Sequence, residues 1–140
     1  MATIEEVERD LMQALLAGED PLMDVLRTQY SVARVKSRDV TGRGFTTWFE
    51  VPADLPLVDR DLLHLDDLQV SLAGVDAPAE AAVTVEKGRL RSLECSVYSG
   101  EWPASPEITG AWYYGSARFP GITPELLAAR DVEPLLEEGE

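Results

Sequence analysis

The spacing of apolar residues over the first 30 positions predicts two helices. Recurrence at intervals of three and four places one apolar set on a single helix face, namely Ile4, Val7, Leu11, Ala14 and Leu15. Thr3 precedes two glutamates, which suit the positive end of a helix dipole, and Gly18 is a natural stop. A second, shorter helix is predicted to start at Asp20, with Pro21 in its first position.

From Tyr30 onward the apolar period changes to two, which predicts strands. The first strand alternates from Tyr30 through Val32 toward Lys36, turns at 41–44, where we expect glycines with positive φ, and returns over 45–51. Prolines then predict an irregular acidic connection over 52–66. Three further strands are predicted, over 67–72, 81–86 and 89–98, with a bulge or a later start near Leu90.

The last third of the chain is broken by Gly and Pro, and its pattern leaves alternatives open. Trp112-Tyr113-Tyr114 fits either a short edge strand or an aromatic flap, and a short helix is predicted from Thr123. Pro134 interrupts that helix, and the final four residues are expected to fray. The order of elements predicts one α+β domain over 1–140: two N-terminal helices on a mainly antiparallel sheet of about five strands, and a short C-terminal helix.

The net charge of the chain limits the kinds of molecule that it is expected to bind. The formal net charge is −14, from 26 acidic and 12 basic residues, and the one basic segment is 27–43. This excess of negative charge disfavours binding to nucleic-acid backbones and to anionic membranes. No apolar run reaches the length of a membrane span, and the acidic start is unlike a secretory signal. We therefore expect a cytoplasmic protein.

The sequence offers few residues that could carry out catalysis or bind a metal ion. Cys95 is the only cysteine, which excludes an intramolecular disulfide and favours a small buried hydrophobe. His64 lies near Asp66 and Asp67, but no nucleophile is placed beside it by the pattern. The acidic stretch lacks calcium-loop spacing, and Gly42-Arg43-Gly44 lacks the phosphate-loop lysine. No catalytic residue, metal or cofactor is predicted.

The acidity favours a non-catalytic module that binds a basic protein. The predicted contact residues are one aromatic anchor and the carboxylates of the acidic stretch: Trp102, Asp54, Asp59, Asp61, Asp66 and Asp67. Two alternatives stay open. One is a small hydrolase or ligand-binding enzyme that uses His64 and Cys95. The other is a homo-oligomer in which the basic 27–43 segment of one copy meets the acidic 50–80 stretch of another.

Two short stretches resemble a small family of uncharacterised, immunity-type bacterial proteins. The first runs from Thr41-Gly42-Arg43-Gly44-Phe45 to Phe49-Glu50-Val51-Pro52, and the second from Gly88-Arg89-Leu90-Arg91-Ser92-Leu93-Glu94 to Tyr98 and Glu101-Trp102-Pro103. The resemblance covers roughly residues 20–105. It implies a bacterial protein whose fold is a sheet with a final Leu-Glu-x-x-x-Tyr strand and a Trp-Pro turn, and no catalytic residue can be carried over from it. An immunity-type inhibitor of a basic toxin or nuclease would use the acidic chemistry described above.

Overall fold

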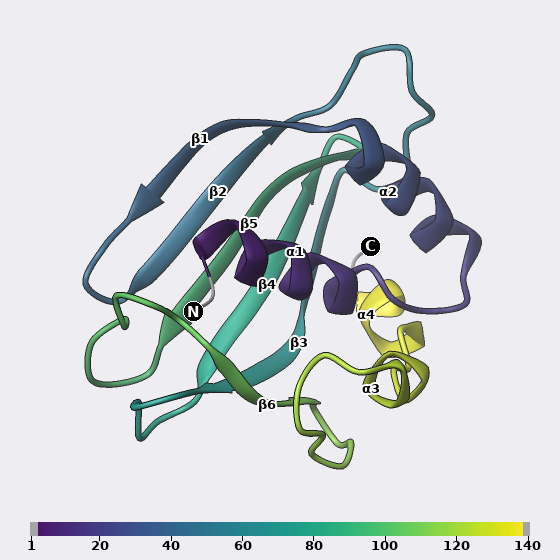
Figure 1. Cartoon of the computed structure of the whole chain (residues 1–140). Helices are drawn as coiled ribbons and strands as arrows, with labels where there is room; N and C mark the ends of the chain where they lie inside the picture. The colour runs from purple at the N-terminus through teal and green to yellow at the C-terminus, as the bar shows by residue number, and fades with distance from the viewer. Residues whose placement is uncertain (1–2, 139–140) are drawn as a thin grey trace.

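The computed structural model describes residues 3–138, which form four helices and one sheet (Figure 1). The helices are α1 (Ile4–Leu15), α2 (Pro21–Val32), α3 (Pro124–Ala128) and α4 (Glu133–Glu138). The strands are β1 (Arg34–Val40), β2 (Gly44–Glu50), β3 (Leu62–Leu72), β4 (Ala79–Glu86), β5 (Arg89–Val97) and β6 (Ile108–Tyr113). The sheet order is β1-β2-β5-β4-β3-β6, with every neighbouring pair antiparallel.

The predicted α+β fold is confirmed, with six strands in the sheet. The additional strand is β6, the segment for which the sequence left an edge strand and an aromatic flap as alternatives. It pairs with β3 through Gln69 and Trp112, among others. The C-terminal part contains two short helices. Pro134 does not interrupt the helix predicted from Thr123, because α3 ends earlier, at Ala128, and Pro134 instead lies in the first turn of α4.

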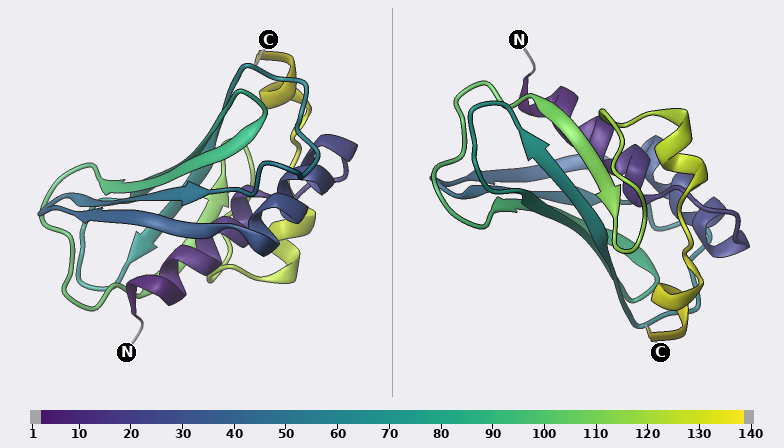
Figure 2. Two further views of the ribbon diagram at one scale, coloured as in Figure 1. Left: turned by 90° about the horizontal axis from the view of Figure 1, so that it is seen from above. Right: turned by 90° about the horizontal axis from the view of Figure 1, so that it is seen from below.

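Both N-terminal helices pack on the same face of the curved sheet (Figure 2). We call this the inner face and the opposite one the outer face. Strand β4 shows the division most clearly, since Ala79, Ala81, Val83 and Val85 are fully buried while the alternate residues are partly exposed. The core therefore fills the space between α1, α2 and the inner face.

Helix α1 is held at its start by a capping box and along one side by burial. The Thr3 side chain accepts from the Glu6 backbone N–H, and Glu6 reaches back to the Thr3 backbone. Leu11, Met12 and Leu15 are completely buried. Each such side chain contributes about 1.5–3 kcal/mol relative to exposure.

The other end of α1 is capped by Arg130, which follows α3. Its guanidinium donates to the carbonyl oxygens of Ala14, Leu15 and Ala17 and pairs with Asp67, at 2.7 Å between Nη2 and Oδ1. Because α1 has no basic residue in its last turn, Arg130 supplies the cation that the negative end of the helix favours. It thereby connects the C-terminal segment, α1 and β3.

Three sequence-based expectations about local structure need correction. Tyr30 and Val32 belong to α2, because Tyr30 lies one turn after Leu26 and packs edge-on against Phe49, with 5.8 Å between ring centroids. Strand β3 starts at Leu62, inside the predicted irregular connection. A register shift between Leu65 and Leu68 breaks the period of two there and hides the first half of the strand.

The third correction concerns the 41–44 turn. Neither of its glycines has the positive φ that we expected. Gly44 is instead required by close packing, since a Cβ at this position would lie 1.9 Å from the Cys95 carbonyl oxygen. The predicted irregularity near Leu90 is confirmed as a register shift between β4 and β5.

Two further expectations concern the chain ends and membranes. Fraying was predicted over 137–140, of which 139 and 140 lie outside the described residues, whereas Glu137 belongs to α4. Among the helices described over 3–138, none combines the length and the apolar character needed to cross a bilayer.

Candidate functional site

The outer face of the sheet is not covered by a helix, and it carries several carboxylates. Alternation along the strands puts five carboxylates on it: Asp39, Glu50, Glu80, Glu86 and Glu94. Between them lie small residues such as Thr46, Ala82 and Ser96. Of these five carboxylates, only Glu86 is in an ion pair with another described residue, Arg91 at 3.2 Å.

The strand order brings carboxylates from distant parts of the chain together. Glu94 lies opposite Ala82, so Glu80 is its diagonal neighbour on β4. Diagonal neighbours are about 7–8 Å apart, and two like charges at about 7 Å repel by about 0.6 kcal/mol in bulk water. A cation bound between them would relieve this repulsion.

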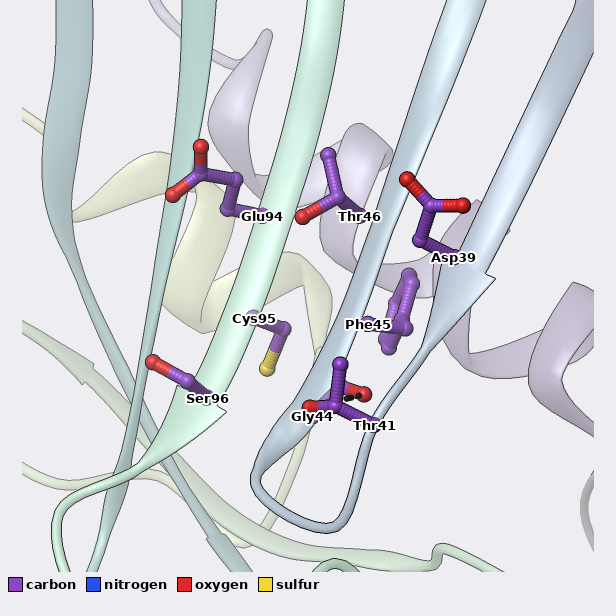
Figure 3. Close-up of a pocket in the computed structure, with 8 residues that line it drawn as sticks. All are labelled: Asp39, Thr41, Gly44, Phe45, Thr46, Glu94, Cys95 and Ser96. Carbon is purple, nitrogen blue, oxygen red and sulfur yellow. Dashed lines mark hydrogen bonds between the residues drawn. The ribbon is translucent and has the colours of Figure 1, made fainter.

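A small hollow of about 110 Å³ marks the β1–β2–β5 side of the outer face. Figure 3 shows Asp39 and Glu94 on either side of Thr46, with Ser96 and Thr41 below them. Asp39 accepts a hydrogen bond from the Trp48 indole nitrogen at 3.4 Å. A second hollow, of about 290 Å³, lies beside it against Trp48, Lys36 and Arg91.

On the outer face, an arginine guanidinium group lies over the ring of each of two tryptophans. The Arg91 guanidinium carbon lies 5.3 Å from the centre of the Trp48 ring, and that of Arg118 lies 4.9 Å from Trp112. Arg118 also donates to the Ser71 hydroxyl at 2.6 Å. Aromatic rings attract cations over their faces, so both rings act as platforms for arginine within this chain.

Near β6, Tyr98 reaches across the outer face toward β4 and β3. Its hydroxyl donates to Glu80 Oε2 and accepts from Gln69 Nε2 at 3.0 Å. The hydrogen bond to Glu80 raises the pKa of Tyr98, with further contributions from burial and from a hydrogen bond with Tyr114. Tyr98 and Tyr114 are nevertheless 48% and 56% exposed, so this cluster presents aromatic surface next to a carboxylate.

The predicted partner-binding residues do not form one surface. Asp54, Asp59 and Asp61 are exposed in the connection that follows β2, and Asp66 is exposed within β3. Asp67 is 7% exposed and forms the internal ion pair with Arg130, so its carboxylate is occupied inside the protein.

Trp102 lies away from the predicted carboxylates. Its backbone N–H donates to the Gly42 carbonyl, near the start of β2, whereas Asp54 follows the end of that strand. Seven residues of strand separate these positions by about 20 Å. The ring is half-buried and packs edge-on against Phe45 at 5.4 Å, which makes it a cover for the core.

His64 and Cys95 lie on opposite faces of the sheet. His64 is exposed on the outer face and is within 3.3 Å of the Thr84 hydroxyl. Cys95 pairs with Phe45 and Ala81 on the inner face, and burial raises the pKa of its thiol to about 12. The sheet therefore prevents the nucleophile–base pair on which the enzyme alternative depends.

Neither a group of metal ligands nor a similarity to known proteins indicates a further site in the described residues. Over residues 3–138, no group of three or more His, Cys, Asp or Glu side chains is placed to hold a metal ion. Comparisons with protein-family models, curated proteins and solved structures find no match. The resemblance to immunity-type proteins thus remains an expectation.

Glu80, Glu86 and Glu94 are absent from the residues that the sequence singled out for partner binding. Glu86 and Glu94 occupy outward positions in strands whose alternation was correctly predicted, whereas Glu80 lies just before the predicted start of its strand at 81, because β4 begins at Ala79. The missing information was the strand order, which places β5 between β2 and β4. Only that order brings Asp39, Glu94 and Glu80 onto one surface.

Proposed function

We propose that this protein is a non-catalytic binding module that docks a basic protein on the outer face of its sheet. The observation that carries the proposal is the uncovered face itself, with five carboxylates of which one is ion-paired within the described residues. Complementary charge accelerates encounter and fixes the register of a partner. The aromatic rings at either side of the face supply the large contact area typical of interface hot spots.

An immunity-type inhibitor of a basic toxin or nuclease is the particular role that fits this chemistry. Such an inhibitor covers a cationic surface that would otherwise contact a phosphate backbone. The overall charge of −14 supports this proposal, since a positively charged enzyme would be drawn to the protein from a distance. A cytoplasmic location would suit this role.

The test is capture from a lysate of the source cell, followed by reconstitution. Immobilised protein should retain one basic protein that elutes in a salt gradient and rebinds at a fixed stoichiometry after purification. The association rate should fall at least tenfold between low salt and 0.5 M salt, because ions screen the attraction. A partner whose association is insensitive to salt, or an acidic partner, would contradict the proposal.

A second candidate is self-association along β1. This edge strand and the preceding helix end expose three valines, with Val32 48%, Val35 46% and Val40 59% exposed. Exposed apolar residues beside a sheet edge favour pairing with another copy. Sedimentation over a range of concentrations tests this. A dimer that persists in high salt would support the apolar contact along β1, whereas one that dissociates in high salt would favour the contact between basic 27–43 and acidic 50–80. A monomer throughout would exclude self-association.

A further inference from the structure

The outer face holds aromatic rings in two different states. Among residues 3–138, the three arginine–ring contacts involve Trp48, Trp112 and Tyr113. The rings of Tyr98 and Tyr114 therefore carry no arginine from the described part of the chain, although both are about half exposed. The same surface thus contains aromatic rings that already hold a guanidinium and others that are free to receive one.

The Tyr98 ring is also fixed in place by its hydrogen bonds. The hydroxyl is held between Glu80 of β4 and Gln69 of β3, which are themselves paired across the two strands. A ring restrained in this way loses little conformational freedom when a ligand covers it. The Tyr98 hydroxyl binds Glu80 through Oε2.

A guanidinium group can use both features at once. Its face stacks on an aromatic ring while its in-plane N–H groups pair with a carboxylate. An ammonium group is a compact point charge and cannot make both contacts with the same geometry. Glu94, the diagonal neighbour of Glu80, adds negative potential at the same place.

From this arrangement we infer that Tyr98, Tyr114 and Glu80 form an arginine-binding site at which a basic partner anchors to the outer face. The inference rests on the proposed function and specifies which partner side chain is recognised, and where. It is distinct from the predicted acidic stretch, since Asp54, Asp59 and Asp61 belong to the connection before β3.

The first experiment is a titration of the ¹⁵N-labelled protein with a hexa-arginine peptide, followed by amide chemical shifts. The expected shifts concentrate at the end of β5, the start of β4 and the β6 end around Tyr98, Glu80 and Tyr114. The same titration with hexa-lysine, which has equal charge, should give an affinity about threefold to tenfold weaker. Shifts that concentrate over 51–61, or equal affinity for the two peptides, would overturn the inference.

Variants with a matched control separate the site from general charge. Tyr98→Leu and Glu80→Gln should each weaken hexa-arginine binding by about fivefold to tenfold. Glu50→Gln removes the same charge as Glu80→Gln from the same face but lies at the far end of β2, away from the cluster, so it should weaken binding by less than about threefold. Equal effects of Glu80→Gln and Glu50→Gln would show that only total charge matters and would refute the site.

These outcomes are independent of those for the proposed function. The peptide experiments locate an arginine site without the natural partner, whereas the function is tested with the captured protein. If a basic partner binds with strong salt dependence but is unaffected by Tyr98→Leu, the site fails and the function stands. If hexa-arginine binds at the cluster and no basic protein is retained from lysate, the function fails instead.

Discussion

Replacing Arg130 by methionine should destabilise the protein more than any change to a surface arginine. The Arg130 side chain is fully buried, and it contacts Asp67, two α1 carbonyls, the carbonyl of Ala17 just past α1, and the ring of Tyr113 at 5.2 Å. Methionine preserves most of the apolar stem but leaves the Asp67 carboxylate buried without a cation. Breaking one partner of a buried pair costs about 3–5 kcal/mol.

The size of the effect can be expressed as a melting shift. For a chain of 140 residues, an unfolding entropy of about 2.1 cal/mol/K per residue gives about 0.3 kcal/mol/K. A loss of 3–5 kcal/mol then lowers Tm by about 10–17 °C. Urea unfolding followed by tryptophan fluorescence gives the free energy directly.

Two comparisons make the Arg130 result interpretable. Arg43→Met alters an exposed arginine that donates to the Tyr98 carbonyl, and it should change the free energy of unfolding by less than about 1 kcal/mol. The double variant Arg130→Met with Asp67→Leu removes both charges and should recover part of the loss. A loss below about 1 kcal/mol for Arg130→Met alone would refute the assignment of Arg130 as the cap of α1.

Three further predictions concern the buried thiol, a glycine and the buried carboxylate of α1. At pH 8 a thiol with a pKa of about 12 is about a thousandfold less ionised than one with the ordinary value of 9.0, so Cys95 should resist a disulfide reagent until the protein unfolds, and fast labelling of the native protein would contradict the burial. Because the folded state favours the neutral thiol, the free energy of unfolding should also fall as pH rises from about 9 to about 12. Gly44→Ala should cost about 1–3 kcal/mol through the clash with the Cys95 carbonyl, whereas Gly42→Ala, with nothing within 4 Å, should cost far less in the same thermal assay. Glu8→Leu should destabilise by about 3–5 kcal/mol, because Glu8 is 6% exposed and binds Arg38 and the Thr47 hydroxyl; urea unfolding that matches the exposed Glu19→Leu variant would contradict this.

The elements of the fold could largely be predicted because most of them depend on local pattern. Thr3 with Glu6, Asp20 with Pro21, and Thr123 with Pro124 all cap helices where the sequence indicated a start. The bulge near Leu90 was visible for the same reason. The first half of strand β3 was not predicted, because its bulge displaces the alternation of apolar and polar residues by one position between Leu65 and Leu68.

The candidate site could not be predicted in the same way, because it depends on contacts between distant segments. The partner of Asp67 is Arg130, 63 residues further on, and nothing local distinguishes this aspartate from the exposed Asp66. The cluster of Tyr98 with Glu80 and Gln69 likewise needs the order β5-β4-β3. Trp102 has the residue type of an interface anchor, yet it packs on Phe45.

Two triple variants of equal charge test most directly whether the outer face is the docking surface. One neutralises the face, through Asp39→Asn, Glu80→Gln and Glu94→Gln, and the other neutralises the connection, through Asp54→Asn, Asp59→Asn and Asp61→Asn. Calorimetric titration with hexa-arginine should show at least about tenfold weaker binding for the face variant and less than about threefold for the other. Loss of affinity in the connection variant, with binding retained by the face variant, would contradict the account.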